Sequence, residues 1–217
     1  MKKGLTELVF ILDKSGSMGG LEKDTIGGYN SMLEKQKAIE GECHITTVLF
    51  NNKYELLHDR INIKAVSKIT EKEYAVGGST ALLDAIGMTI HKTGNAQKHT
   101  AEDYRAEKVI FVIITDGEEN SSREYSAQKV KAQIERQKVS YGWEFIFLGA
   151  NIDAVETAAR FGISEDRAQN YHADSEGVEL NFRVMSEAVA SFRECSAMPE
   201  GWNDEIQEDY KKRGGRK

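Results

Sequence analysis

Short apolar runs alternate with longer amphipathic segments along this chain. Unbroken apolar runs occupy residues 8–12, 109–114 and 145–148, and each stops at an aspartate, a threonine or a glycine. Such runs are typical of strands buried on both faces of a sheet, because no position in them has to face water. The pattern therefore predicts three central strands.

Segments with apolar residues at helical spacing lie between these runs. They predict helices at residues 21–39, 81–92, 124–138, 152–161 and 178–192. Residues 93–107 carry few apolar side chains and are interpreted as a helix end followed by a surface loop.

Two shorter extended segments complete the pattern. The β-rich run 45–50 stops at a polar turn and a second run begins at 54–57, which predicts an antiparallel hairpin. Residues 167–172 predict a short edge strand. Strands that alternate with helices indicate an α/β fold, in which helices cover both faces of a mostly parallel sheet.

Composition and charge narrow the classes of function. The chain has 217 residues, of which 40% are hydrophobic, and its net charge is −6. This charge provides no global basic field, so we expect neither nucleic acid nor a membrane as a partner. No stretch approaches the ~18 apolar residues of a membrane span, and the apolar run near the N-terminus is too short for a signal peptide. Cys43 and Cys195 form no disulfide framework or metal-ligand cluster, so we expect a reducing, cytoplasmic setting.

Three polar clusters fall where the loops of such a fold converge. Asp13-Lys14-Ser15-Gly16-Ser17 follows the first apolar run, Gly78-Ser79-Thr80 precedes a helix, and Thr115-Asp116-Gly117 follows the most apolar run. In open α/β sheets, ligands bind outside the carboxyl ends of the strands. We therefore expect these clusters to share one site.

The side chains in these clusters are hard oxygen donors. Asp13, Ser15 and Ser17 alternate, so a tight loop can aim their oxygens inward, and Gly16 allows the chain to turn between them. A few carboxylate and hydroxyl oxygens with open positions suit Mg²⁺, and the same donors suit Mn²⁺ or Ca²⁺. Because the set lacks histidine and cysteine, it does not favour Zn²⁺.

These clusters resemble the metal-ion-dependent adhesion site (MIDAS) of von Willebrand factor A (vWA) domains, whose pattern is Asp-x-Ser-x-Ser, then a Thr, then an Asp. The match includes all five positions, which are Asp13, Ser15, Ser17, Thr80 and Asp116. The resemblance implies that Mg²⁺ is contacted directly by the three hydroxyls and largely through water by the two carboxylates. A metal face surrounded by neutral hydroxyls stays electrophilic, so it can attract an acidic side chain.

The resemblance also implies a fold and a function. It implies a doubly wound, vWA/Rossmann-like sheet with one antiparallel edge strand, and a metal-dependent module that is not an enzyme and that binds a protein partner presenting Asp or Glu. In element order it covers about residues 5–195. We expect a vWA-type domain at residues 1–198 and a flexible C-terminal tail at 199–217. The basic residues of this tail are expected to be solvated, and they are Lys211, Lys212, Arg213, Arg216 and Lys217.

The main alternative is an enzymatic function in which Asp13 takes part in the reaction. Asp13 after a buried strand resembles the nucleophile of a haloacid-dehalogenase-type phosphatase, with Thr80 and Asp116 as phosphate and Mg²⁺ ligands. That family usually has a second aspartate two residues after the first, where this chain has Ser15, which cannot serve as a general acid. Because of this departure, the sequence favours the binding module over a Mg²⁺-dependent phosphatase.

Nucleotide binding and serine hydrolysis have less support in the sequence. The first loop lacks the Gly-x-x-x-x-Gly-Lys-Ser/Thr spacing of a nucleotide-binding P-loop, and residues 15–19 lack the leading glycine of a Gly-x-Ser-x-Gly hydrolase elbow. A metal-independent scaffold with the same fold stays open. At single positions, Thr80 and Asp153 can also be interpreted as helix N-caps, and Glu118-Glu119-Asn120 as a solvated loop.

Overall fold

The structure, a computed structural model, describes residues 1–215. Its strands are β1 (Lys2–Asp13), β2 (Cys43–Phe50), β3 (Tyr54–Asn62), β4 (Ala106–Thr115), β5 (Glu144–Gly149) and β6 (Ala168–Asn170). Its α-helices are α1 (Glu22–Ala38), α2 (Leu82–His99), α3 (Ala127–Tyr141), α4 (Ala154–Arg160), α5 (Ser175–Cys195) and α6 (Asp204–Lys212). Four short 3-10 helices lie in the connections.

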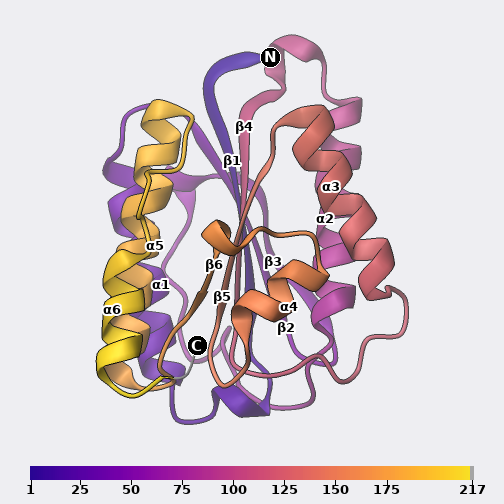
Figure 1. Ribbon diagram of the computed structural model, residues 1–217. Coiled ribbons are helices and arrows are strands. Elements are labelled where there is room, and N and C mark those ends of the chain that lie inside the picture. Colours follow the sequence, from indigo (N-terminus) through magenta and orange to yellow (C-terminus); the bar gives the residue numbers. More distant parts are fainter. Residues whose placement is uncertain (216–217) are drawn as a thin grey trace.

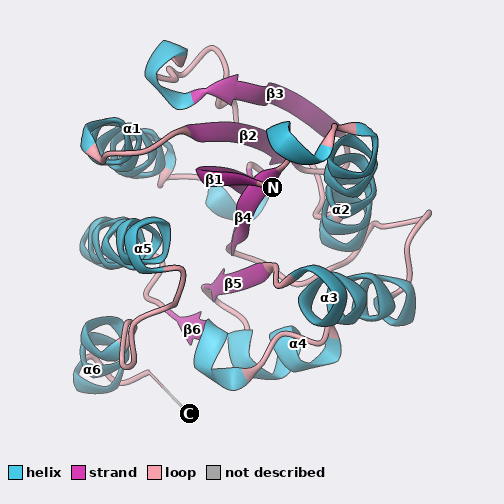
Figure 2. Ribbon diagram, turned by 90° about the horizontal axis from the view of Figure 1, so that it is seen from above, coloured by secondary structure: helices cyan, strands magenta, loops and turns pink. Residues whose placement is uncertain are grey.

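One six-stranded sheet in the order β3-β2-β1-β4-β5-β6 divides the molecule into layers. All neighbouring strands are parallel except β2 and β3, which form an antiparallel hairpin at one edge. Helices α1, α5 and α6 cover one face, and α2, α3 and α4 cover the other (Figure 2). The predicted doubly wound fold with one antiparallel edge strand is confirmed.

The two central strands are buried because both of their faces meet a helical layer. Along β1, even-numbered residues such as Phe10 pack in the core under α1 and α5, and odd-numbered residues such as Ile11 pack in the core under α2 and α3. Strand β4 alternates in the same way. This double burial explains why both strands are continuously apolar in sequence.

The carboxyl ends of β1, β4 and β5 lie together at the lower end of the molecule in Figure 1. There Asp13 is the last residue of β1, and Thr115 is the last residue of the neighbouring β4. The N-terminus lies at the opposite end (Figure 1). The first and third polar clusters of the sequence therefore lie at the ends of the two central strands, which are buried on both faces.

The stretch after residue 198 contains a helix that the sequence pattern does not indicate. Helix α6 packs beside α5, with Trp202 and Ile206 buried. The Trp202 indole N–H donates to the Asp166 carbonyl at 2.9 Å, and Arg183 of α5 pairs with Glu205 of α6 at 2.6 Å. The domain boundary at residue 198 stays a prediction, and Arg216 and Lys217 of the basic run lie outside the described residues.

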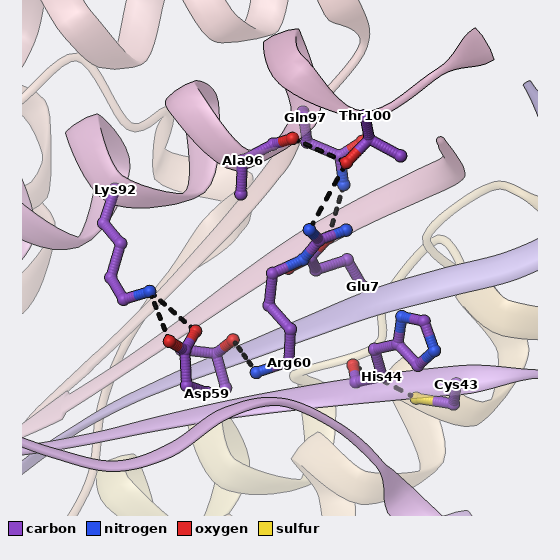
Figure 3. Close-up of polar contacts among 10 residues, drawn as sticks. Glu7, Cys43, His44, Asp59, Arg60, Lys92, Ala96, Gln97 and Thr100 are labelled. Atoms are coloured by element: carbon purple, nitrogen blue, oxygen red, sulfur yellow. Dashed lines mark hydrogen bonds and ion pairs between the residues drawn. The ribbon is translucent and has the colours of Figure 1, made fainter. Parts of the chain in front are cut away.

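A buried ion pair lies on the α2 side of the sheet (Figure 3), and its Glu7 precedes Asp13, the last residue of β1, by six residues. Glu7 of β1 is fully buried, and one of its carboxylate oxygens accepts from Arg60 Nε at 2.7 Å. The other oxygen accepts from the Gln97 side-chain amide of α2. Burial raises the pKa of Glu7, and the Arg60 charge opposes that rise. The pair joins β1, β3 and α2 through one buried carboxylate.

Among residues 1–215, no helix is both long enough and apolar enough to cross a membrane.

Candidate metal-binding site

Three loops meet at the carboxyl end of the sheet, and backbone hydrogen bonds hold two of them together. The Gly16 N–H donates to the Gly78 carbonyl, and the Gly77 N–H donates to the Lys14 carbonyl, both at 2.9 Å. These two bonds join the loop after β1 to the loop before α2. The geometry requires glycine at residue 78, because its φ is +83° and a Cβ there would lie 2.2 Å from the Asn52 side chain.

Asp13 lies at the centre of the site and is fully buried. One carboxylate oxygen accepts from the Ser15 backbone N–H at 2.6 Å, and the other accepts from the Thr115 hydroxyl at 2.6 Å. The Tyr74 hydroxyl donates to the Asp13 carbonyl. Burial raises the pKa of Asp13, and the hydrogen bonds to its carboxylate oppose that rise. The carboxylate is therefore rigidly oriented.

The three candidate hydroxyls come close to one another. Ser15 Oγ lies 3.0 Å from Ser17 Oγ. A Cβ built on Gly117 would lie 2.9 Å from Ser17 Oγ and 3.6 Å from Thr80 Oγ1, so these two hydroxyls flank the same point. Ser15 and Thr80 are buried, whereas Ser17 is exposed. The cluster of three hydroxyls is thus open to solvent on the Ser17 side.

Asp116 adds a second carboxylate beside this group and is 1% exposed. Asn151, which follows β5, donates its side-chain amide to Asp116 Oδ1. Burial raises the pKa of Asp116 to about 6; the bond from Asn151 opposes the rise, and the nearby Asp13 charge adds to it. Two desolvated carboxylates in each other's field form a site that a cation would stabilise.

The loop at residues 118–120, interpreted from sequence as solvated, is instead partly structural. The Glu119 carboxylate accepts from the backbone N–H groups of Leu83, Ser121 and Ser122 at 2.7 to 2.9 Å. Asn120 exchanges hydrogen bonds with the Thr80 backbone, at 2.9 Å and 3.1 Å. Glu119 caps α2 because an anion is favoured at a helix N-terminus.

This arrangement also decides whether Thr80 is a helix cap. Helix α2 begins at Leu82, its N-cap residue is Ala81, and no side chain of that residue caps it. Since Glu119 satisfies the Leu83 N–H, the Thr80 hydroxyl is left for the site. Asp153, in contrast, caps α4 as predicted, accepting from the Glu156 N–H at 2.9 Å.

The residues that orient the two aspartates have little or no signal in the sequence. Thr115, Tyr74 and Asn151 all hydrogen-bond to one of the two aspartates. In the sequence, Thr115 stands out only as a neighbour of Asp116. A signal exists for Asn151: it follows an apolar strand, as Asp13 and Asp116 do. No sequence signal marks Tyr74, which lies in an irregular segment.

The donor set fits a hard divalent cation. It offers two carboxylates and three hydroxyls, which are the oxygen ligands that Mg²⁺ and Mn²⁺ prefer. Within residues 1–215, no group of three or more histidine, cysteine, aspartate or glutamate side chains is arranged to hold a metal. A metal held here would therefore depend on the serine and threonine hydroxyls.

Gly117 offers a test of the site that changes no charge. In Gly117→Ala, the new methyl would lie 2.9 Å from Ser17 Oγ, so the serine hydroxyl has to shift from its position beside Thr80. Because Mg²⁺ demands nearly ideal ligand geometry, we expect its affinity to fall by roughly tenfold. Isothermal titration measures this change. Gly94→Ala is the matched control, since its nearest neighbour would lie at 3.5 Å. Equal Mg²⁺ affinity in both variants would contradict the placement of Ser17.

Comparisons with known proteins show similarity at the level of structure. No protein-family model matches the sequence, and no curated protein matches it. Proximal thread matrix protein 1 from the mussel byssus superposes with a TM-score of 0.60 at 14% identity, over 86% of this chain and 46% of that chain. Another structure of the same protein, with a zinc-occupied MIDAS motif, has a TM-score of 0.59 at 12% identity, over 86% of this chain and 46% of that chain.

Two further structures have somewhat lower TM-scores. The von Willebrand factor type A structure from Catenulispora acidiphila has a TM-score of 0.58 at 14% identity, over 86% of this chain and 42% of that chain. The ArnB paralog VWA2 from Sulfolobus acidocaldarius has a TM-score of 0.54 at 17% identity, over 87% of this chain and 45% of that chain. The chain thus spans about half the length of these proteins. At such identities the likeness establishes the fold.

Proposed function

We propose that this chain, which has the von Willebrand factor A fold, is a metal-dependent binding module that holds Mg²⁺ at the carboxyl end of its sheet and captures an acidic side chain of a protein partner. The observation that carries the proposal is the convergence of Asp13, Asp116 and the three hydroxyls from separate loops. When bound, the metal supplies an electrophilic position for a carboxylate. Mn²⁺ or Ca²⁺ can take the place of Mg²⁺.

In this proposal each side chain has a stated task. Ser15, Ser17 and Thr80 would hold the metal as neutral ligands, so they would not cancel its charge. Asp13 and Asp116 would hold it largely through water and would compensate part of its positive charge. The hydrogen bonds from Thr115 and Asn151 keep the two carboxylates in place before any metal arrives.

The geometry gives less support to a phosphatase. Asp13 is fully buried, and each of its two carboxylate oxygens already accepts a hydrogen bond at 2.6 Å. A nucleophile needs an oxygen that faces its substrate. Assay of phosphate ester hydrolysis with Mg²⁺ separates the two functions: turnover that is lost in Asp13→Asn would replace the binding module with the enzyme.

Paramagnetic Mn²⁺ tests the proposed metal directly. Titrated into the ¹⁵N-labelled protein, Mn²⁺ is expected to broaden the amide signals of the three site loops, at residues 13–17, 78–80 and 115–117, before any others. Excess Mg²⁺ should restore these signals by competition, and a chelator should do the same. Broadening that starts at other acidic surfaces would contradict the proposal.

Capture of a partner provides the second half of the test. A peptide that contains one aspartate is expected to bind in Mg²⁺ and to be released by chelator, whereas the same peptide with asparagine is not expected to bind. A pull-down with and without chelator then searches for the natural partner. Binding that survives chelation would support the metal-independent scaffold instead.

Metal binding should depend on pH through Asp116. In the metal-free protein its pKa is raised from 3.8 to about 6, so protons compete with a cation below that value. At pH values above 6 we expect Mg²⁺ to raise the melting temperature clearly. Below pH 6 we expect this rise to become progressively smaller. Thermal unfolding with and without Mg²⁺ on both sides of this pKa measures the effect. If the rise in melting temperature caused by Mg²⁺ is the same above and below this pKa, metal binding does not depend on the ionisation of Asp116.

A further inference from the structure

The loop between β4 and α3, residues 116–126, lies along one side of helix α2. It contacts that helix and the residues just before it at positions three or four apart, which is the spacing of one helical face. These positions are Thr80, Leu83, Asp84 and Gly87. Thr80, at one end of this stripe, and Asp116, at the start of the loop, both belong to the candidate metal site.

Asp84, in the first turn of α2, makes most of the hydrogen bonds to the second half of the loop. Its Oδ1 accepts from the backbone N–H groups of Glu124 and Tyr125 at 2.9 and 2.8 Å. Its Oδ2 accepts from the Arg123 N–H at 2.8 Å, and its own backbone N–H donates to Ser122 Oγ at 3.0 Å. Hydrogen bonds to a carboxylate are stronger than those between neutral groups. Three of them to consecutive N–H groups fix residues 123–125 against α2.

Glu119 makes the reciprocal contact from the loop to the helix. Its carboxylate accepts from the Leu83 N–H of α2 at 2.9 Å. The helix and the loop therefore each supply a carboxylate that accepts backbone N–H groups of the other. One turn further along α2, Gly87 allows the Tyr125 ring to lie directly on the helix, because a Cβ at residue 87 would overlap that ring. The loop is thus attached to α2 over two helical turns.

This attachment joins two of the loops that carry the metal site. Asn120 exchanges hydrogen bonds with the Thr80 backbone at 2.9 and 3.1 Å, and Asp116 lies only four residues before Asn120. A loop that is held on α2 at residues 119–125 therefore limits where the Asp116 carboxylate can lie relative to the Thr80 hydroxyl. Because Mg²⁺ demands nearly ideal geometry, its affinity should depend on this relative placement.

We propose that Asp84 is a positioning residue for the metal site, which fixes Asp116 relative to Thr80 by holding residues 122–125 on α2. The inference rests on the proposed function, because it gives Asp84 a task in metal binding. Asp84 does not contact the metal in this proposal. The segment 80–84 then has two tasks: its first residue offers a hydroxyl to the metal, and its last residue anchors the loop that carries the second aspartate.

Two variants of Asp84 test this task by degrees. Asp84→Ala removes all three acceptor contacts, whereas Asp84→Asn keeps one oxygen, which can still accept from Glu124 and Tyr125. We expect the Mg²⁺ affinity to fall about tenfold in Asp84→Ala and by a smaller factor in Asp84→Asn, as isothermal titration measures it. Asp174→Ala is the matched control. Asp174 also accepts from a backbone N–H in the first turn of a helix, that of Gly177 at 2.9 Å, but in α5. Its loss should lower the melting temperature and leave the Mg²⁺ affinity unchanged.

Amide hydrogen exchange separates positioning from a general loss of stability. In metal-free Asp84→Ala, the amides of residues 121–125 should exchange faster than in the wild type, while those of the central strand β4 keep their protection. Mg²⁺ should slow the exchange of residues 121–125 again, because a metal that needs the attached loop stabilises that state. A general loss of stability would instead change the exchange of β4 as well.

The outcomes distinguish this inference from the proposed function. A wild-type protein that binds no Mg²⁺ would overturn the proposed function and the inference with it. If the wild type binds Mg²⁺ and Asp84→Ala binds it equally well, the inference alone is overturned. The same holds if the loop amides exchange no faster in Asp84→Ala, or if Asp174→Ala loses as much Mg²⁺ affinity as Asp84→Ala does.

Discussion

Asp116→Asn is expected to weaken Mg²⁺ binding about 10- to 100-fold and, at the same time, to stabilise the metal-free protein. The substitution keeps the shape of the side chain and an oxygen that accepts from Asn151. It removes a carboxylate that is 1% exposed and whose pKa is raised from 3.8 to about 6. Above that pKa, ionisation of Asp116 costs the folded state free energy, because the unfolded chain ionises more readily.

Calorimetric titration and thermal unfolding measure the two effects together. Asp13→Ala serves as the more severe variant: it should also lose Mg²⁺, but it leaves the Ser15 N–H and the Thr115 hydroxyl without their acceptor and should lower the melting temperature. Opposite stability changes in two variants that both lose the metal would separate binding from folding. If Mg²⁺ affinity is unchanged in one of the two variants, the aspartate that it replaces does not serve the metal.

Much of the fold can be predicted because the buried strands carry a simple signal. The central strands meet a helical layer on each side, so their middle residues are all apolar and the run is visible in the sequence. The hairpin edge is visible through the polar turn at residues 51–53. The type of an element is therefore predictable where burial alone determines which residue types occur in it.

The predicted strands are too short where polar residues continue an element. The apolar run predicts that β1 begins at residue 8, yet the strand begins at Lys2, and the residue that hides this is the buried Glu7. The pattern predicts an extended run only at residues 54–57, yet β3 continues to Asn62 through partly exposed edge positions. A pattern of apolar residues cannot reveal a charge whose partner lies on another strand.

The candidate site, too, can be predicted from the sequence only in part. The oxygen donors are visible in the sequence because they follow strand ends in a recognisable spacing, whereas their hydrogen-bonding partners are not. Glu119 looks solvated in the sequence, because its three acceptor contacts are to backbone N–H groups that come together only in the folded loop. Helix α6 escapes prediction because only Trp202 and Ile206 of its region are buried, too few for a periodic signal.

Arg60→Ala is expected to destabilise the protein by about 3 to 5 kcal/mol at neutral pH, because it leaves the Glu7 carboxylate buried without its charge partner. Glu7 is fully buried and Arg60 is 23% exposed, so water cannot easily replace the guanidinium (Figure 3). The Gln97 amide remains as a partner but carries no charge. Urea unfolding of both proteins measures the difference in the free energy of unfolding.

The pH dependence of that difference identifies its cause. Burial already raises the pKa of Glu7 above 4.5, and loss of Arg60 should raise it further. The cost of the substitution is therefore full above the folded-state pKa of the variant and shrinks as the pH falls through that value, since Glu7 then takes up a proton. Arg60→Ala combined with Glu7→Leu should recover most of the stability, because no buried charge is left. A loss that is independent of pH and persists in the double variant would mean that Arg60 acts through packing in β3 and not through its charge.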